Sequence, residues 1–242
     1  MDVEISIVIP SYNESKNLPI FLKNVEKIYE QDYNLVNYIE IILVNNGSND
    51  QTKNIILNHN LYKKKLIKFL NIEVNQGYGN GIIEGIRIAK GQCIGWTHAD
   101  NQTDFKDLIY AFKKNKEDLI KSKILVKGLR VNRNIFDAFF TKAMSIFVFL
   151  FLGYKVSDIN AQPKIFNRSL TSFFQNPPLD FSLDLYLLLI AKKNKIKIIE
   201  YPVYFNKRLL GEAKGGGSIK GKMKLVFRTI NYIIKLKYKW KL

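Results

Sequence analysis

The chain has 242 residues, of which 47% are hydrophobic and 13% aromatic, and this composition excludes a disordered protein. Its formal net charge of +17 predicts an anionic partner, and nucleic acid, an anionic membrane surface and phosphorylated substrates all fit that charge. No zinc-finger, homeodomain or RNA-motif signature accompanies the charge, so nucleic acid is not expected. The single cysteine, Cys93, excludes an intramolecular disulfide and favours a reducing compartment.

The N-terminal residues and the longest apolar run of the chain bear on its localisation. The first residues, 1–4 (MDVE), lack the basic region of a signal peptide. The longest dense apolar run, 143–153, is shorter than the roughly 20 residues that a membrane-spanning helix needs. We therefore expect no transmembrane helix, and a protein that is either cytosolic or peripheral on a membrane.

Buried-strand runs and helical periodicities alternate along the chain. Pro10 stops the first strand, and Asn13 or Ser15 is expected to cap the first helix. Pro202 is expected to end the last strand. This alternation predicts an α/β fold with a mostly parallel, doubly wound sheet. The predicted strands are 5–9, 39–44, one within 66–74, 92–96, 124–127 and 195–201. The predicted helices are one with an apolar face over 18–28, 52–57, one that the turn 77–81 opens and Gly91 ends, 104–115, 134–152, 181–191 and one after 219.

Two predicted helices are unusual. The helix over 134–152 is apolar on nearly every side, which indicates burial in protein or contact with a membrane. The tail, 216–242, has helical apolar spacing with lysines between, which fits an anionic membrane interface or a helix packed on the domain with solvated lysines. We divide the chain into a domain over 1–215, with halves 1–115 and 116–215, and this basic amphipathic tail.

Four polar turns follow four predicted strands. They are 10–14, 45–48, 75–81 and 98–102. The carboxyl ends of parallel strands share one rim of the sheet, where such folds bind ligands. Glycines in the third turn permit close backbone approach, and a helix N-terminus after it favours an anion. In the fourth turn, His98, Asp100 and Gln102 alternate, so an extended chain would present them on one side as metal ligands, whereas a polar helix cap at Thr103 or Asp104 is the competing interpretation.

Three of these turns, with their flanks, resemble family 2 glycosyltransferases. The similar segments are 7–14 (IVIPSYNE), 44–50 (VNNGSND) and 75–81 (NQGYGNG). This resemblance implies a GT-A fold and an inverting transferase that uses a nucleotide-sugar donor. The second half is similar to the dolichol-phosphate mannose synthase and polyprenyl-phosphate glycosyltransferase branch, through 128–130 (GLR), Ser145, 152–158 (LGYKVSD), 200–203 (EYPV) and 208–214 (RLLGEAK).

Roles for individual residues follow from this resemblance. It implies nucleotide binding by Pro10, Tyr12, Glu14, Asn46, Gly47, Asn75, Gly77, Gly79 and Asp100. It implies a metal motif of His98, Asp100 and Gln102, in which His98 replaces the first aspartate. It implies acceptor binding by Arg130, Lys142 and Ser145. The expected catalytic residues are Asp100, Arg130, Asp158, Arg208 and Lys214.

The resemblance and the residue types predict a reaction. Mg²⁺ or Mn²⁺ with Arg and Lys groups would stabilise a departing nucleoside diphosphate, and the donor is a GDP- or UDP-sugar. A polyprenyl phosphate acceptor is already ionised and needs no general base. A saccharide acceptor, the alternative in surface-polysaccharide assembly, needs a carboxylate base, for which Asp158 and Asp184 are candidates. A non-catalytic nucleotide binder and an integral membrane partner are further alternatives.

Overall fold

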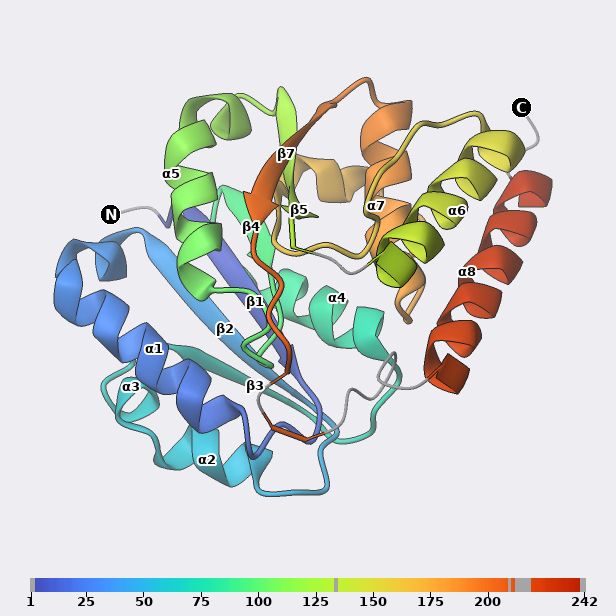
Figure 1. The fold of residues 1–242 in the computed structure, drawn as a ribbon. Coiled ribbons are helices and arrows are strands. Elements are labelled where there is room, and N and C mark those ends of the chain that lie inside the picture. Colours follow the sequence, from blue (N-terminus) through green and yellow to red (C-terminus); the bar gives the residue numbers. More distant parts are fainter. Residues whose placement is uncertain (1–2, 133–134, 209, 212–218, 240–242) are drawn as a thin grey trace.

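The fold is built around one twisted sheet, seen in a computed structural model that describes residues 3–132, 135–208, 210–211 and 219–239. Within the described residues the sheet has seven strands in the order β3-β2-β1-β4-β6-β5-β7 (Figure 1). Only β6 runs antiparallel to its neighbours. The strands are β1 (Ile5–Ser11), β2 (Ile39–Asn46), β3 (Lys68–Ile72), β4 (Cys93–Trp96), β5 (Ile124–Arg130), β6 (Lys164–Asn167) and β7 (Lys197–Val203).

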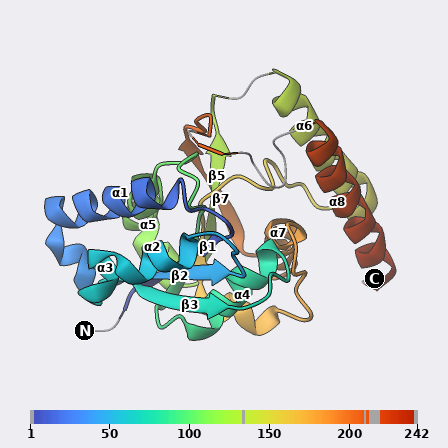
Figure 2. The ribbon, with the colours of Figure 1, turned by 90° about the horizontal axis from the view of Figure 1, so that it is seen from below.

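Helices cover both faces of the sheet and form two cores. Alternate residues of β1 point to opposite faces, so Ile7 packs in one core and Val8 in the other. The first core includes side chains of α1 and α5, and the second includes side chains of α4 and α7 (Figure 2). The helices are α1 (Leu18–Gln31), α2 (Thr52–Asn58), α3 (Asn60–Lys63), α4 (Tyr78–Ile88), α5 (Phe105–Ile120), α6 (Ile135–Leu152), α7 (Ser182–Lys193) and α8 (Ile219–Lys239), with short 3₁₀ turns at Tyr33–Asn37 and Arg168–Phe173.

The predicted α/β class with a mostly parallel, doubly wound sheet is confirmed. Four local predictions are wrong. The sequence analysis missed β6, Pro10 lies inside β1 rather than stopping it, Pro202 lies inside β7 rather than ending it, and α1 has no side-chain cap from Asn13 or Ser15. Pro202 is tolerated because β7 is an edge strand, where a missing backbone donor need not interrupt a ladder.

The helices α6 and α8 lie side by side at one flank of the fold (Figures 1 and 2). Val148 of α6 and Ile233 of α8 are fully buried against the second core. The outer side of the pair remains exposed, with Phe139 at 67%, Leu150 at 70% and Phe227 at 57% exposure. Among the described residues, no helix is both long and apolar enough to cross a membrane.

Candidate active site

The polar turns that follow β1, β2, β3 and β4 meet at one rim of the sheet, as predicted. The main-chain N–H of Asn13 donates to Ser48 Oγ at 2.9 Å, which joins the first turn to the second. The Asn46 amide donates to the Gly77 carbonyl at 2.9 Å, which joins the second to the third. The Asn101 amide reaches back to the Asn17 carbonyl at 3.0 Å, so the fourth turn contacts the segment that leads into α1.

The fourth turn is not extended. Asn101 adopts a positive φ of 58°, and Asp100 Oδ1 accepts the main-chain N–H of Gln102 at 3.1 Å. The Asp104 carboxylate caps α5 by accepting the N–H of Lys106 at 2.9 Å. The predicted helix cap at Asp104 is therefore confirmed, and the metal site predicted for His98, Asp100 and Gln102 stays a prediction.

His98 lies against an aromatic stack. Its ring centroid is 5.4 Å from that of Tyr78, and Tyr78 stacks on Phe181 at 4.5 Å with an interplanar angle of 8°. Burial raises the pKa of the Tyr78 hydroxyl, and the charges of Asp184 and Asp100 raise it further. The imidazole thus packs against Tyr78, at the position where the related motif has an aspartate.

Arg208 brings a positive charge to this turn from a distant part of the chain. Figure 1 shows the segment after β7 running toward the carboxyl ends of β1 and β2. Arg208 Nη2 donates to both carboxylate oxygens of Glu14, at 2.7 and 2.5 Å, and Nη1 lies 3.6 Å from Asp100 Oδ2. Two hydrogen bonds between Asn206 and Gln102 hold the segment in place, at 2.8 and 3.2 Å. Glu14 therefore pairs with Arg208, and the nucleotide contact predicted for Glu14 stays a prediction.

A divalent cation fits this turn only with help from a ligand. The described residues contain no cluster of three or more His, Cys, Asp or Glu side chains able to hold a metal ion. Asp100 contributes one carboxylate, and Gln102 keeps its amide oxygen available because its nitrogen bonds Asn206. Mg²⁺ is often bound through one or two carboxylates plus substrate phosphate, so the residues present suit a metal that arrives with a diphosphate.

The glycines of the third turn lie close to the backbone of a distant segment of the chain. A Cβ on Gly77, whose φ is +118°, would lie 2.3 Å from the Leu179 carbonyl oxygen, and one on Gly79 would lie 2.5 Å from that of Pro178. The N–H of Asn80 in the first turn of α4 donates to the same Leu179 oxygen at 3.1 Å. The absence of a Cβ at these glycines therefore lets the backbone of 178–179 approach closely. The Leu179 carbonyl also accepts the N–H of Asn80, which we expected to face an anion.

Arg130, the last residue of β5, forms an ion pair with Asp158. The Asp158 carboxylate accepts the main-chain N–H of Arg130 at 2.9 Å and its Nε at 3.0 and 3.1 Å. The guanidinium also lies over the Phe205 ring, 5.1 Å from its centroid. Lys142 is exposed on α6, and the Ser145 hydroxyl donates to the Thr141 carbonyl of the same helix at 3.0 Å. The predicted acceptor residues thus come from two elements, β5 and α6.

A second ion pair is buried beneath the rim. Lys164 and Asp184 have side-chain exposures of 0% and 1%, and Lys164 Nζ lies 3.4 Å from Asp184 Oδ1. The same carboxylate accepts the Trp96 indole N–H at 3.2 Å and the Gln162 amide at 3.1 Å. Burial lowers the pKa of Lys164 to about 8, while the charge of Asp184 acts in the opposite direction. Asp184 therefore ties the end of β4 to α7.

Other predicted residues can be placed directly. Pro10 and Tyr12 are partly buried at the end of β1 and just beyond it. Gly47 has a φ of +71°, and a Cβ there would lie 2.3 Å from the main-chain nitrogen of Asn75. Lys214 lies outside the described residues. The sequence analysis missed Asn17, Asn101 and Asn206, and only contacts between distant segments identify them.

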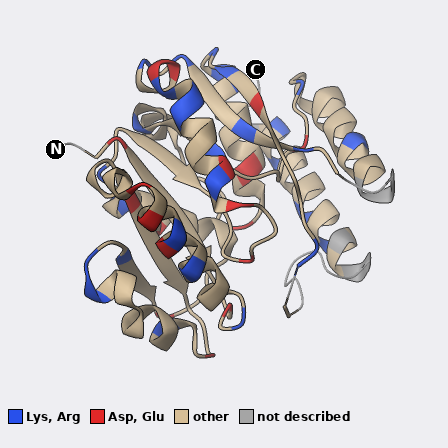
Figure 3. Cartoon of the chain, turned by 60° about the vertical axis from the view of Figure 1, so that its left-hand side comes forward, with Lys and Arg blue, Asp and Glu red and all other residues tan. Residues whose placement is uncertain are grey.

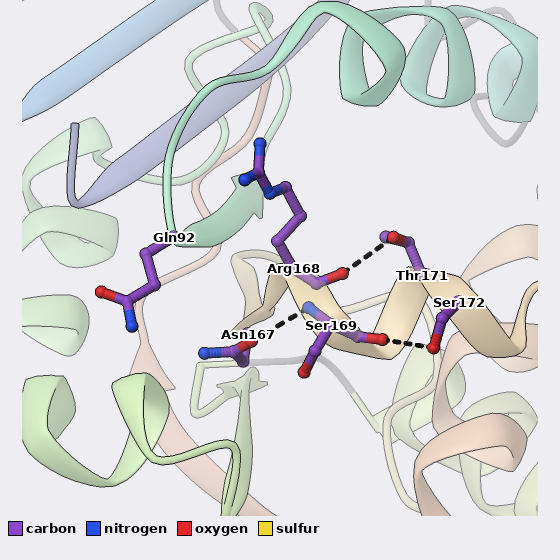
Figure 4. A pocket seen from close by; sticks show the side chains of 6 residues that line it. All are labelled: Gln92, Asn167, Arg168, Ser169, Thr171 and Ser172. Atoms are coloured by element: carbon purple, nitrogen blue, oxygen red, sulfur yellow. Dashed lines mark hydrogen bonds between the residues drawn. The ribbon is translucent and has the colours of Figure 1, made fainter. Parts of the chain in front are cut away.

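The distribution of basic residues does not mark this rim, and neither does a surface depression elsewhere on the fold. Lys and Arg lie on many elements rather than in one patch (Figure 3). A depression of about 440 Å³ is lined by Gln92, Asn167, Arg168, Ser169, Thr171 and Ser172 (Figure 4). Gln92 precedes β4 whereas Asp100 follows it, so this depression lies at the opposite end of the strand. One nitrogen of the Arg168 guanidinium, Nη1, donates a hydrogen bond to the Ala89 carbonyl at 3.1 Å.

Comparison with known proteins agrees with the fold. A family model described as glycosyl transferase family 2 matches residues 6–173. A dolichyl-phosphate beta-glucosyltransferase of Trichomonas vaginalis is 31% identical over 90% of this chain and 70% of its own length, and a second one is 28% identical over 95% and 74%.

Solved structures show the same fold. Glucosyl-3-phosphoglycerate synthase from Mycobacterium tuberculosis, in complex with Mn²⁺ and UDP-glucose, is 14% identical, covers 97% of this chain and 79% of its own, and has a TM-score of 0.68. S. aureus TarS in complex with UDP-GlcNAc is 22% identical, covers 96% and 66%, and has a TM-score of 0.62. These likenesses confirm the expected GT-A fold.

Proposed function

Because the chain belongs to glycosyl transferase family 2, we propose that it is a hexosyltransferase that moves glucose from a nucleotide-sugar donor to a polyprenyl phosphate of the dolichyl type. The observation that carries this proposal is the similarity over nearly the whole chain to proteins named dolichyl-phosphate beta-glucosyltransferases. UDP-glucose is the donor that we favour over a GDP-sugar, because the solved structures with the same fold hold UDP-glucose or UDP-GlcNAc.

The reaction exchanges one bond for another at the anomeric carbon. An oxygen of the acceptor phosphate attacks this carbon while the bond to the nucleoside diphosphate breaks, which yields the lipid phosphate sugar and the free diphosphate with inversion. A bound Mg²⁺ or Mn²⁺ would neutralise the charge of the leaving diphosphate. Asp100 would hold that ion, and Arg208, with Lys214, would donate to phosphate oxygens. Pro10, Tyr12 and Asn46 would bind the nucleoside.

The state of the buried acids favours a phosphate acceptor over a sugar hydroxyl. A hydroxyl acceptor needs a carboxylate base that can reach it. Asp158 is bonded to Arg130, and Asp184 is almost fully buried beside Lys164. A phosphate acceptor needs no base, and Arg130, Lys142 and Ser145 would bind its oxygens. The saccharide acceptor is therefore the weaker candidate.

The exposed side of the helix pair supports a membrane location. It combines large apolar side chains such as Leu150 and Phe227 with four exposed basic side chains of α8, those of Lys224, Arg228, Lys235 and Lys237. Apolar side chains flanked by lysines suit the surface of an anionic bilayer, where the polyprenyl acceptor resides. We propose that this side rests on the inner membrane face, and a cytoplasmic, peripheral enzyme follows from that placement.

Transfer into lipid tests the proposed reaction. We expect product from labelled UDP-glucose and dolichyl phosphate to extract into organic solvent, and we expect Asp100→Asn to lose about 100-fold in rate. Asp118→Asn, an exposed acid on α5, is the matched control and should keep wild-type activity. Sugar found only on water-soluble acceptors, or full activity of Asp100→Asn, would contradict the proposal.

Binding to vesicles tests the membrane location. Vesicles that contain phosphatidylserine should bind the chain without any partner protein, and replacement of both Leu150 and Phe227 by Glu should weaken this binding about tenfold or more, because both side chains are mostly exposed. The same replacement of exposed Tyr33, far from α6 and α8 in sequence, is the control. Equal binding by all three proteins would refute this orientation.

A further inference from the structure

Asn17, which precedes α1, joins three segments of the rim. Its side chain donates from Nδ2 to Glu14 Oε2 at 2.8 Å and to the Leu210 carbonyl at 3.0 Å. Its main-chain carbonyl accepts from the Asn101 amide at 3.0 Å. The residue is 1% exposed. One buried side chain therefore contacts the turn after β1, and its main chain contacts the turn of the metal motif.

Helix capping does not explain this side chain. Asn17 occupies the N-cap position of α1, yet its side chain makes no capping hydrogen bond. Both partners of Nδ2 can only accept, so the amide nitrogen must face them. Its Oδ1 is left buried with no hydrogen-bond partner among the described residues. A buried oxygen without a hydrogen-bond partner costs free energy. The fold accepts this cost at Oδ1 and keeps the two hydrogen bonds that Nδ2 donates.

Asn17 and Arg208 share the same two acceptors. Arg208 Nη2 bonds the Glu14 carboxylate, and Arg208 Nε donates to the Leu210 carbonyl at 2.9 Å. Asn17 thus fixes the separation of the two groups that orient the guanidinium. Nη1, the remaining nitrogen, lies 3.6 Å from Asp100. Moving either acceptor would turn Nη1 away from the metal-motif turn.

We propose that Asn17 is a positioning residue that acts through Glu14 and Leu210 to place the Arg208 guanidinium beside Asp100. This inference rests on the proposed donor site, where that guanidinium would meet the nucleoside diphosphate. A donor group fixed in advance stabilises developing charge without reorganisation of the site. Asn17 then affects donor binding only through its effect on Arg208.

A double-mutant cycle on the full-length chain tests this coupling. UDP affinity in the presence of Mn²⁺ is measured by calorimetry for wild type, Asn17→Ala, Arg208→Gln and the double variant. We expect each single change to weaken binding about tenfold, as for loss of a charge-assisted hydrogen bond, and the double variant to bind no more weakly than Arg208→Gln. Asn17→Asp, which keeps the side-chain size but loses both donors, should bind as weakly as Asn17→Ala.

Asn167→Ala is the matched control. Asn167 is also buried, and its Nδ2 also bridges two carbonyls, of Leu119 and Ile120 at 3.1 and 2.8 Å, but at the other end of β4. This variant should lose stability and bind UDP as wild type does. Independent effects in the cycle, or wild-type affinity of Asn17→Asp, would overturn the inference, since packing alone would then explain Asn17.

Limited trypsin digestion separates this inference from the proposed function. Cleavage after Lys207 should be about tenfold faster in Asn17→Ala than in wild type, because the contact to Leu210 is lost, and unchanged in Asn167→Ala. Unchanged cleavage in Asn17→Ala overturns the positioning role even if the enzyme transfers glucose. Wild-type chain that binds no UDP with Mn²⁺ or Mg²⁺, although cleavage responds as expected, overturns the proposed donor site and with it the role assigned to Asn17.

Discussion

The buried pair of Lys164 and Asp184 should make the fold sensitive to a single change below the rim. Lys164 Nζ donates to the Ile159 and Ala161 carbonyls at 2.9 and 2.6 Å, in addition to its contact with Asp184. The substitution Lys164→Met keeps a long side chain in this space but removes the charge and all three contacts. A carboxylate and two carbonyl groups would then remain buried without their cation.

The loss can be bounded from these contacts. Breaking a buried ion pair by removing one partner costs about 3–5 kcal/mol. For a chain of this length that corresponds to a fall in Tm of roughly 6–20 °C. Adding Asp184→Asn to Lys164→Met removes the orphaned charge and keeps an oxygen for Trp96 and Gln162. The double variant should therefore be more stable than Lys164→Met alone.

Urea unfolding followed by tryptophan fluorescence measures both effects. Lys197→Met, at an exposed lysine of β7, is the control and should change the free energy of unfolding by less than about 0.5 kcal/mol. If Lys164→Met is no more costly than this control, burial of the pair has no energetic consequence. If the double variant loses the sum of both single effects, the orphaned charge is not the cause of the loss.

Two further predictions concern single positions away from the ion pairs. Burial and the charge of Asp104 raise the pKa of Asp107 to about 6, so between pH ~4 and ~6 the folded chain keeps a proton that the unfolded chain has released, and stability falls as pH rises through this window. Asp107→Asn should lack this pH dependence of the free energy of unfolding. Urea titrations of both proteins at pH 4.5 and 7 should therefore show that wild type loses stability relative to the variant as the pH rises. A stability difference that stays constant between the two pH values would contradict the raised pKa. Gly47→Ala and Gly153→Ala introduce a Cβ at nearly the same φ, +71° and +74°, but only the first would clash, 2.3 Å from Asn75 N. Gly153→Ala should cost about 1–2 kcal/mol from the backbone conformation alone, and Gly47→Ala clearly more, so equal losses in thermal unfolding would refute the clash.

The apolar runs of β1, β2 and β4 could be predicted because each side chain in them is buried on one face or the other. The strand β6 could not, because its first residue is Lys164, and a lysine in a four-residue segment gives no apolar run. Its burial depends on Asp184, an acid twenty positions later in a helix. Local pattern carries no information about such a partner.

Part of the candidate site could likewise be predicted from the sequence, and part of it could not. The turns could be placed at one rim because parallel strands dictate it. The glycines at 77 and 79 indicate close approach, but the sequence does not say whether a ligand or Leu179 approaches. The ion pair of Arg208 with Glu14 joins residues 194 positions apart. Family resemblance assigned both residues to the substrate, whereas their contact with each other required the fold.

The pairing of acids with arginines bears on how one site would handle two phosphates. Glu14 holds one edge of Arg208, and Asp158 holds one edge of Arg130, so neither guanidinium is buried without a counter-charge when substrates are absent. Each of these acids is thereby paired with an arginine. We propose that the remaining donors of Arg208 face the departing diphosphate and those of Arg130 face the acceptor phosphate, on opposite sides of the transferred sugar. An acceptor without a negative charge would leave Arg130 with no new partner, so the same contacts that position the arginines select for a phosphate nucleophile.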